Sequence, residues 1–232
     1  MHFHLPKPLH GWGEFLREYA IVVLGVLTAL GLEQIVSSAH ERRLAREARE
    51  AINQELQIDL DRIAYRTQLQ SCDERRLSDI QALLAGWSGD NAFPPGLNIG
   101  FPGDVGLVDQ RWQANLSSGR FSEQSPEQQA EQASIYTMIH VISGAEARET
   151  ADWGQLRSLE LGSRSLTVAS KPMIAEALAA ARGDAHVLGR LTFFFLRRMR
   201  QAGAGRPGMT PSANFSAAVP GTACEPMPRA PA

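Results

Sequence analysis

An apolar stretch near the N-terminus, residues 19–36, constrains the fold of this chain more than any other feature. Up to Leu32 it carries no charge, and it consists mainly of Ile, Val, Leu and Ala. As a helix it would be roughly 27 Å long at 1.5 Å per residue, which is close to the roughly 30 Å hydrocarbon thickness of a bilayer. Trp12, Phe15 and Tyr19 lie at its start, where aromatic side chains favour the membrane–water interface. The stretch therefore predicts a transmembrane helix.

Two other interpretations of this stretch are open. A cleaved signal peptide would end at small residues, which Ser37, Ser38 and Ala39 supply, but positive charge is expected where Glu14 and Glu18 lie. A buried core helix of a soluble protein is the second alternative, because the strictly apolar run is short. The length of the stretch and its acidic N-terminal flank favour the membrane anchor.

Charges on the two sides of the stretch indicate an orientation. Lys7 and Arg17 precede it, and four arginines follow it: Arg42, Arg43, Arg46 and Arg49. Lysine and arginine are enriched on the cytoplasmic side of membrane helices. The difference gives a weak preference for a cytoplasmic C-terminal domain, and the opposite single-pass topology is the alternative.

A long stem helix is predicted to continue from the anchor through residues 37–87. No proline interrupts it, and no glycine occurs between Gly31 and Gly86. Apolar residues recur at spacings of three and four, which places them on one helix face: Ala45, Ala48, Ile52, Leu56, Leu60 and Ile63. The stripe is irregular at Asp73, so packing against later helices of the same chain is favoured over a coiled coil. A homo-oligomer through the stem is the alternative.

Residues 88–124 are expected to form a long loop with one short helix. Turn-forming residues dominate the first half, as in Phe93-Pro-Pro-Gly96 and Phe101-Pro-Gly-Asp104. Residues 111–116 are the candidate for the short helix. A loop of this length is unusual in a compact domain and is often functional.

A helical block is predicted over residues 125–202. Ser125 can cap its first helix, Pro126 suits the first helical position, and Gln128 completes a capping box. Inward-facing isoleucines and Trp153 then continue the pattern, so this helix is expected to run to about Leu159.

The last part of the block is expected to divide into two helices. One begins near Ser170 and ends at Gly183, and Asp184 is expected to cap the other, which reaches about Ala202. The second contains Leu191-Thr-Phe-Phe-Phe-Leu196, followed by arginines. A core-closing helix with a cationic last turn is favoured over a membrane-surface helix, because consecutive phenylalanines give no single apolar face. After it, residues 203–232 are rich in Gly, Ala and Pro and predict a disordered tail.

The search for chemical motifs predicts no catalytic, cofactor-binding or metal-binding residue. None of the six histidines has a metal-ligand spacing, and no nucleophile elbow or phosphate-binding loop occurs: His2, His4, His10, His40, His140 and His186. An enzyme with an unrecognised site would find its best local candidates in one segment: His140, Glu146, Glu149 and Asp152. The formal charge of −2 gives no basis for expecting a nucleic-acid partner.

The chain has two cysteines, Cys72 and Cys224. Two are too few for a disulfide framework or a metal cage. A single disulfide between them is possible but unsupported by the sequence. The sequence also does not indicate whether the protein lies in an oxidising or a reducing compartment.

The N-terminal region carries a resemblance to a family. Its elements are Leu5-Pro-Lys-Pro-Leu-His-Gly-Trp-Gly-Glu-Phe-Leu-Arg-Glu18, Ile21-Val-Val-Leu-Gly-Val-Leu27, Glu33-Gln34 and Glu47-Ala-Arg-Glu-Ala-Ile52. Over about the first 60 residues these segments resemble a group of uncharacterised bacterial proteins. The resemblance implies one N-terminal membrane helix, a helical remainder and a bacterial inner-membrane location. It implies no activity, cofactor or catalytic residue.

Together these features predict an all-α protein in which a transmembrane helix continues into a long helix that packs with about three further helices. The expected parts are an N-terminal flank (1–18), the transmembrane helix (19–36), the stem (37–87), the loop (88–124), the helical block (125–202) and the tail (203–232). We expect a non-enzymatic interaction or scaffold role at the membrane, with a protein partner of unknown identity. A sensor-like ligand-binding helical bundle is the alternative.

Overall fold

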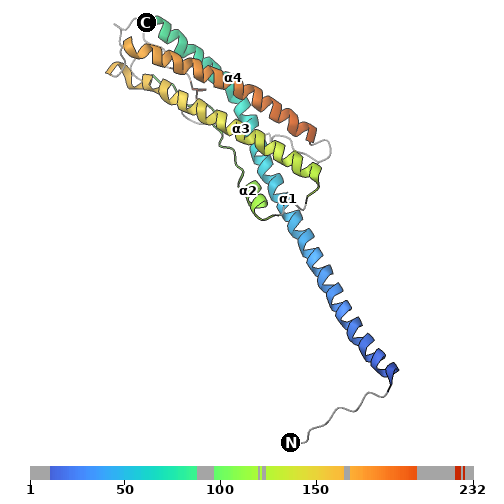
Figure 1. The fold of residues 1–232 in the computed structure, drawn as a ribbon. Coiled ribbons are helices and arrows are strands. Elements are labelled where there is room, and N and C mark those ends of the chain that lie inside the picture. The colour runs from blue at the N-terminus through green and yellow to red at the C-terminus, as the bar shows by residue number, and fades with distance from the viewer. Residues whose placement is uncertain are drawn as a thin grey trace, which may run out of the picture. The chain divides into compact units, whose positions relative to one another are not determined.

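The computed structural model describes residues 11–87, 97–119, 121, 124–164, 168–202, 223–225 and 227. Within them the chain is helical and forms no strand, which confirms the predicted all-α class (Figure 1). The four α-helices are α1 (Trp12–Gly86), α2 (Gln110–Ser117), α3 (Pro126–Leu156) and α4 (Lys171–Ala202). Two 3₁₀ segments, η2 (Arg157–Arg164) and η3 (Val168–Ser170), connect α3 to α4.

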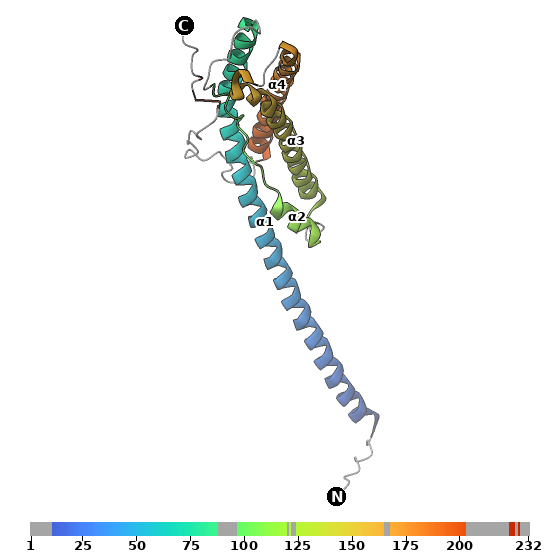
Figure 2. The same ribbon diagram turned by 90° about the vertical axis from the view of Figure 1, so that its left-hand side faces the viewer.

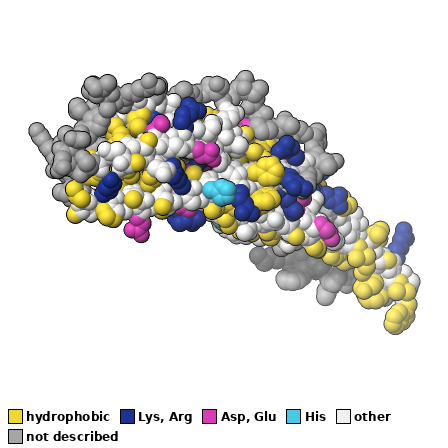
Figure 3. Space-filling view, turned by 90° about the horizontal axis from the view of Figure 1, so that it is seen from above, with side chains coloured by type: hydrophobic (Ala, Val, Ile, Leu, Met, Phe, Trp, Pro, Cys, Tyr) yellow, Lys and Arg dark blue, Asp and Glu magenta, His cyan; other side chains and the backbone are white. Residues whose placement is uncertain are grey.

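Two compact units divide the chain, Met1–Glu50 and Ala51–Ala232. The described part of the first unit is the N-terminal portion of α1. By length and composition this portion can cross a membrane, and none of its most apolar window is buried. Hydrophobic side chains cover the surface of this end of the chain in Figure 3. The second unit, called the helical domain below, contains α2, α3, α4 and the remainder of α1.

Helix α1 is 75 residues long, and the predicted continuation of the apolar helix to Gly86 is confirmed. Its continuity follows from the absence of proline and of interior glycine between Gly31 and Gly86. In the helical domain one side of α1 is buried by the same chain, from Ile52 to Leu84. This part of α1 therefore packs within the chain, and a homo-oligomer through the stem stays a prediction.

Two hydrophobic clusters form the core of the helical domain. In one, Leu77 and Ile80 of α1 pack with Trp153 of α3 and with Ile174 and Leu178 of α4. The beginning of α4 is therefore beside the end of α1, so these two helices run antiparallel. Figures 1 and 2 show that α3 and α4 lie side by side.

The second cluster lies at the other end of the domain. It joins Ile52 and Leu56 of α1 to Ile139 of α3 and to Phe195 and Met199 of α4. Trp112 of α2 stacks on Tyr136 of α3 with ring centroids 4.6 Å apart, which attaches the short helix to the same cluster.

The helical block begins as predicted and then differs in two places. The Ser125 hydroxyl accepts a hydrogen bond from the Gln128 N–H at 3.4 Å, which is the expected cap. Helix α3 ends at Leu156, earlier than expected, and continues as the 3₁₀ segment η2. The expected break at residues 183–184 is wrong, because α4 is one helix through both positions.

The reason lies in the core. Ala181 and Ala185, on either side of the predicted break, are both buried in the first cluster. Their packing outweighs the roughly 1 kcal/mol that a helical glycine costs relative to alanine. Asp184 lies inside α4, 3.6 Å from the Arg148 guanidinium of α3, and caps no helix.

Most of the predicted disordered tail, and residues 88–96 of the predicted loop, lie outside the described residues. Residues 223–225 are described and lie against the helical domain. Ala223 is buried, and its N–H donates a hydrogen bond to the Phe101 carbonyl at 2.9 Å.

The second cluster gives a direct test of this core. Replacing the fully buried Ile139 with alanine should lower the free energy of unfolding by about 2–5 kcal/mol, because the lost methyl groups leave a cavity between three helices. Val141 on the same helix is exposed, so Val141→Ala should change the free energy by less than about 0.5 kcal/mol. Urea unfolding followed by circular dichroism measures both, and equal losses would contradict the packing described.

Candidate functional site

A row of charged side chains on one face of α1 faces the loop that leads to α2. Its members recur at helical spacings, so they lie along one side of the helix: Glu55, Asp59, Arg62, Arg66, Asp73 and Arg76. All but Arg62 are buried. We call this row, together with Glu146 and Glu149 of α3 and Glu160 of η2, the charged clamp.

The carboxylates of the clamp accept hydrogen bonds from backbone N–H groups of the loop. Glu55 accepts from the N–H groups of Arg111 at 2.7 Å and Trp112 at 3.1 Å, which are the second and third residues of α2. The Tyr136 hydroxyl donates to the same carboxylate at 2.7 Å. A carboxylate at this position also suits the positive end of the helix dipole.

Further along the loop the same pattern repeats. Asp59 accepts from the Val108 N–H at 3.0 Å, and Glu160 accepts from the Ile99 and Gly100 N–H groups at 2.9 and 3.3 Å. Backbone hydrogen bonds also join Asp73 to Gly103 and Glu146 to Val105. Because the loop has no regular ladder of its own, these carboxylates satisfy donors that burial would otherwise leave unpaired.

Two arginines of the clamp donate hydrogen bonds to backbone carbonyl groups. Arg62 donates to the Gly106 carbonyl, and Arg76 donates to the carbonyls of Asn98 and Glu225. The loop is therefore held through both its N–H and its C=O groups.

At the centre of the clamp, Arg66 joins two helices. It donates to Asp73 at 2.8 Å and to both oxygens of Glu149 at 2.9 and 2.7 Å. The three side chains are at most 2% exposed. Such a pair is costly to break, because the remaining partner is left buried and uncompensated.

The centre holds more carboxylates than arginines. Burial raises the pKa of Asp73 to about 7, although Arg66 opposes the shift. Burial, with Asp104 nearby, raises the pKa of Glu146 to about 7, and burial also raises the pKa of Glu149. One oxygen of Glu146 has no hydrogen-bond partner among the described residues, and leaving a neutral carboxyl in this state costs less free energy than leaving a carboxylate. The centre therefore takes up and releases protons near neutral pH.

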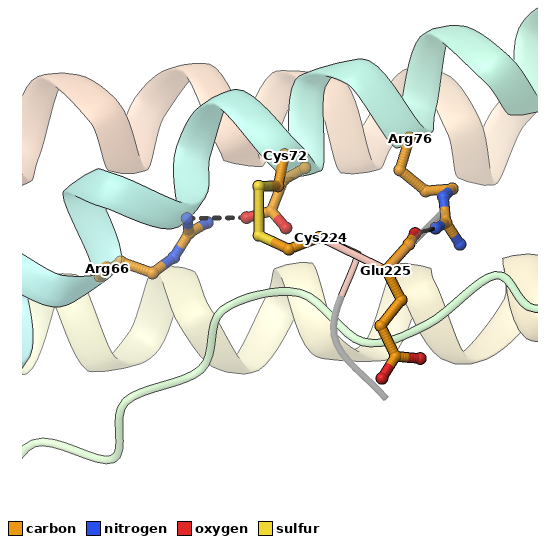
Figure 4. Close-up of a disulfide and its surroundings, with 6 residues drawn as sticks. Arg66, Cys72, Arg76, Cys224 and Glu225 are labelled. Carbon is orange, nitrogen blue, oxygen red and sulfur yellow. Dashed lines mark hydrogen bonds and ion pairs between the residues drawn. A yellow bond between two sulfur atoms is a disulfide. The ribbon is translucent and has the colours of Figure 1, made fainter. Parts of the chain in front are cut away.

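A disulfide bond between Cys72 and Cys224 lies next to this centre. Cys72 directly precedes Asp73 on α1, and Figure 4 shows the bond beside Arg66, with Arg76 directed at Glu225. The pairing that the sequence left open is thus present. Both cysteines are half-buried.

The four local candidates for an enzyme site are not brought together. Glu146 and Glu149 belong to the clamp centre, whereas His140 pairs with Asp109 at 2.8 Å on the surface. Asp152 is half-buried, and burial raises its pKa. His40 and His186 are exposed, and the three N-terminal histidines lie outside the described residues. In the described part of the chain no group of His, Cys, Asp and Glu is arranged to hold a metal ion.

The sequence did not single out Arg66, Asp73 or Glu55 as clamp residues. A usable signal was present, because charges recur at spacings of three, four and seven beside the apolar stripe of α1. What the sequence lacks is the loop's position, which decides whether such charges are solvated or buried.

Comparisons with protein-family models, with curated proteins and with solved structures gave no match. The role of the clamp is therefore inferred from the positions and hydrogen bonds of its residues alone. Its described hydrogen bonds go to the protein's own backbone and side chains, so its evident role is to position the loop and α2.

The titration of the clamp predicts a pH dependence of stability. The folded-state pKa of Glu146 is above its ordinary value, so its contribution to stability is complete at low pH and is lost as the pH rises through about 7. Asp73 and Asp59, also raised, to about 7 and about 6, act with the same sign. The free energy of unfolding should fall between pH 5 and pH 8.

A matched pair of variants isolates this effect. Glu146→Gln keeps an uncharged side chain at every pH and should reduce the fall, whereas Glu176→Gln, on the exposed side of α4, should leave it unchanged. Urea unfolding at several pH values measures the slope. An identical slope in wild type and Glu146→Gln would show that Glu146 does not titrate in this range.

Proposed function

We propose that the chain is a single-pass membrane protein whose helical domain has a non-enzymatic interaction or scaffold role. The observation that carries this proposal is the uncovered apolar surface of α1, from which the chain continues into a packed helical domain. An apolar helix of this length that no other element covers is stable in a bilayer and is costly in water. The resemblance of the N-terminal segments to bacterial membrane proteins supports an inner-membrane location.

We propose further that the helical domain lies on the non-cytoplasmic side of the membrane. Disulfides persist in oxidising compartments and are rare in the cytosol, where thiols are kept reduced. The half-buried Cys72–Cys224 bond supports this side. The arginines after the anchor favour the cytoplasm, but a charge bias is a statistical preference, whereas the disulfide requires an oxidising environment to form.

The outer face of α4 offers an interaction surface. Phe193 and Phe194 are exposed at 55% and 47%, while Phe195 between α4 and the core is fully buried. Three exposed arginines adjoin the two phenylalanines and have no carboxylate partner among the described residues: Arg190, Arg197 and Arg198. No acidic residue occurs between Asp184 and Ala202.

This face favours a protein partner with an apolar centre and acidic residues around it. Aromatic residues and arginine are enriched at the energetically important positions of interfaces, and opposite charge speeds and orients association. This helix can close the core and also bind a partner. Its side chains Thr192, Phe195 and Met199 are buried in the core, whereas the interaction face is on its exposed side.

The alternative, a sensor-like ligand-binding bundle, has less support. A ligand site would need convergent polar groups with free hydrogen-bonding capacity around a cavity. The polar groups that converge in this domain are those of the clamp, and most of them bind the loop.

Topology can be measured with reporters in bacterial cells. Alkaline phosphatase fused after Ala202 should be active and green fluorescent protein fused there should be dark, because the domain is placed outside the cytoplasm. The same reporters at the N-terminus should give the reverse result. Fluorescence from the fusion after Ala202 would contradict the proposed side, and two periplasmic ends would contradict the anchor.

The interaction face can be tested by site-specific cross-linking. A photo-cross-linking residue at Phe194 in the full chain should give a product with a second protein in native membranes. Arg197→Glu should weaken this association about tenfold, equivalent to about 1.4 kcal/mol, because it reverses charge beside the contact. Arg111→Glu, an equal change at an exposed position of α2, should have no effect. A product that contained only this chain would contradict a partner protein.

A further inference from the structure

The described residues near the C-terminus, 223–225, form a short strap across the helical domain. The interactions that hold the strap include the Cys72–Cys224 bond, the hydrogen bond from the Ala223 N–H to the Phe101 carbonyl, and contacts of Glu225. The Glu225 carbonyl accepts from Arg76, and its carboxylate accepts from the Asn98 side-chain amide at 3.2 Å. These bonds are with α1 and with the loop that the clamp holds, and the Ala223 side chain also lies in the first hydrophobic cluster, against which Met227 packs.

The non-covalent part of this attachment is small. Ala223 is the only one of the three residues that is buried, and alanine buries little apolar surface. The net contribution of a hydrogen bond is modest because water competes for the same groups. Ordering three residues costs backbone entropy. The disulfide is therefore the strongest single restraint on the strap.

The strap lies over the most charged part of the interior. Cys72 is adjacent in sequence to Asp73, which binds Arg66 and is 1% exposed. The strap also supports the loop at Asn98 and Phe101, on either side of the Glu160 contacts to Ile99 and Gly100. In Figure 4 the disulfide lies between the Arg66 and Arg76 side chains.

We propose that the Cys72–Cys224 disulfide is a redox-operated clasp: in its oxidised form it holds residues 223–225 over the loop, and its reduction releases the strap and opens the loop and the clamp centre to solvent. The proposal goes beyond the interaction role proposed above and does not depend on the membrane side or on the partner of α4.

The reaction is a thiol–disulfide exchange with a dithiol, either a small molecule or an oxidoreductase. A thiolate of the dithiol attacks one sulfur of the half-buried bond, and the other cysteine leaves as a thiolate that takes up a proton. The second thiol of the reductant, as a thiolate after loss of its proton, then attacks the reductant's own sulfur in the mixed disulfide. The remaining protein cysteine leaves as a thiolate and takes up a proton. Two electrons pass to the protein, which ends with two free thiols, and the dithiol ends as a disulfide.

Release has a local and a wider consequence. Locally, the Phe101 carbonyl loses the Ala223 N–H and Arg76 loses the Glu225 carbonyl, although Arg76 keeps the Asn98 carbonyl. The loop N–H groups bound by Glu160 and Asp73 then lie in a segment with fewer restraints. The hydrogen bonds that are lost are not part of the packing of α3 on α4. Of residues 223–225 only Ala223 belongs to the first hydrophobic cluster, so most of that packing should remain.

Hydrogen–deuterium exchange of the full chain in detergent micelles tests the clasp. Exchange is compared for the oxidised protein, the protein treated with dithiothreitol, and the Cys72→Ser/Cys224→Ser variant. Amides of residues 98–105 should exchange at least tenfold faster in the second and third samples. Amides of residues 135–142 in α3 should accelerate far less than those of the loop and serve as the internal comparison, because they lie in the helix core. Dithiothreitol should have no further effect on the double variant.

Two outcomes would overturn the proposal. Equal exchange of residues 98–105 in oxidised and reduced protein would show that the strap does not restrain the loop. Acceleration of α3 and α4 after reduction by the same factor as residues 98–105 would show that the bond acts on the whole domain and is no local clasp. A Cys224→Ser single variant separates bond loss from any effect of a new side chain on α1, and it should match the reduced protein.

Discussion

The helical domain depends on a loop whose backbone is bound by buried charges. A connection of this length has no hydrogen-bonding ladder, and its polar groups cannot be buried without partners. The carboxylates of Glu55, Asp59 and Glu160 accept hydrogen bonds from its backbone N–H groups. The guanidinium groups of Arg62 and Arg76 donate hydrogen bonds to its carbonyl oxygens. Charged partners make stronger hydrogen bonds than neutral ones, so few side chains are enough. The loop in turn positions α2, whose Trp112 packs on α3.

This arrangement explains why the centre of the domain carries an excess of negative charge. Each backbone N–H needs an acceptor, and carboxylates are the acceptors that α1 and α3 supply. One arginine, Arg66, donates hydrogen bonds to Asp73 and Glu149, and its charge only partly offsets the effect of burial on Glu146. Burial raises the pKa of Glu146 to about 7. Protonation of such carboxylates lowers the negative charge of the interior. Proton uptake near neutral pH is a consequence of how the loop is held.

The parts of the fold that sequence predicts are those governed by local rules. The continuity of α1 follows from missing helix breakers, and the start of α3 follows from Ser125 and Pro126. The helix break predicted at Gly183 was wrong, because core packing of the residues on both sides outweighs the free-energy cost of a glycine in a helix. The clamp and the disulfide could not be predicted, since Cys72 and Cys224 are 152 residues apart and their contact depends on the complete tertiary fold. Periodicity identifies a charged face but does not determine what covers it.

The covalent link and the clamp share one element, since Cys72 lies on α1 between Arg66 and Arg76. Any event that moves the strap therefore acts on the helix face that already holds the loop. The disulfide closes a long loop of chain, and a link of this kind restricts the unfolded state more than the folded one. Its position near the C-terminus has a different effect in the folded state. The flanking residues Ala223 and Glu225 add hydrogen bonds and a small apolar contact, so the covalent bond is the strongest single restraint on the segment that covers this edge of the charged interior. Stability of the core and covering of the clamp are thereby separable properties of the same domain.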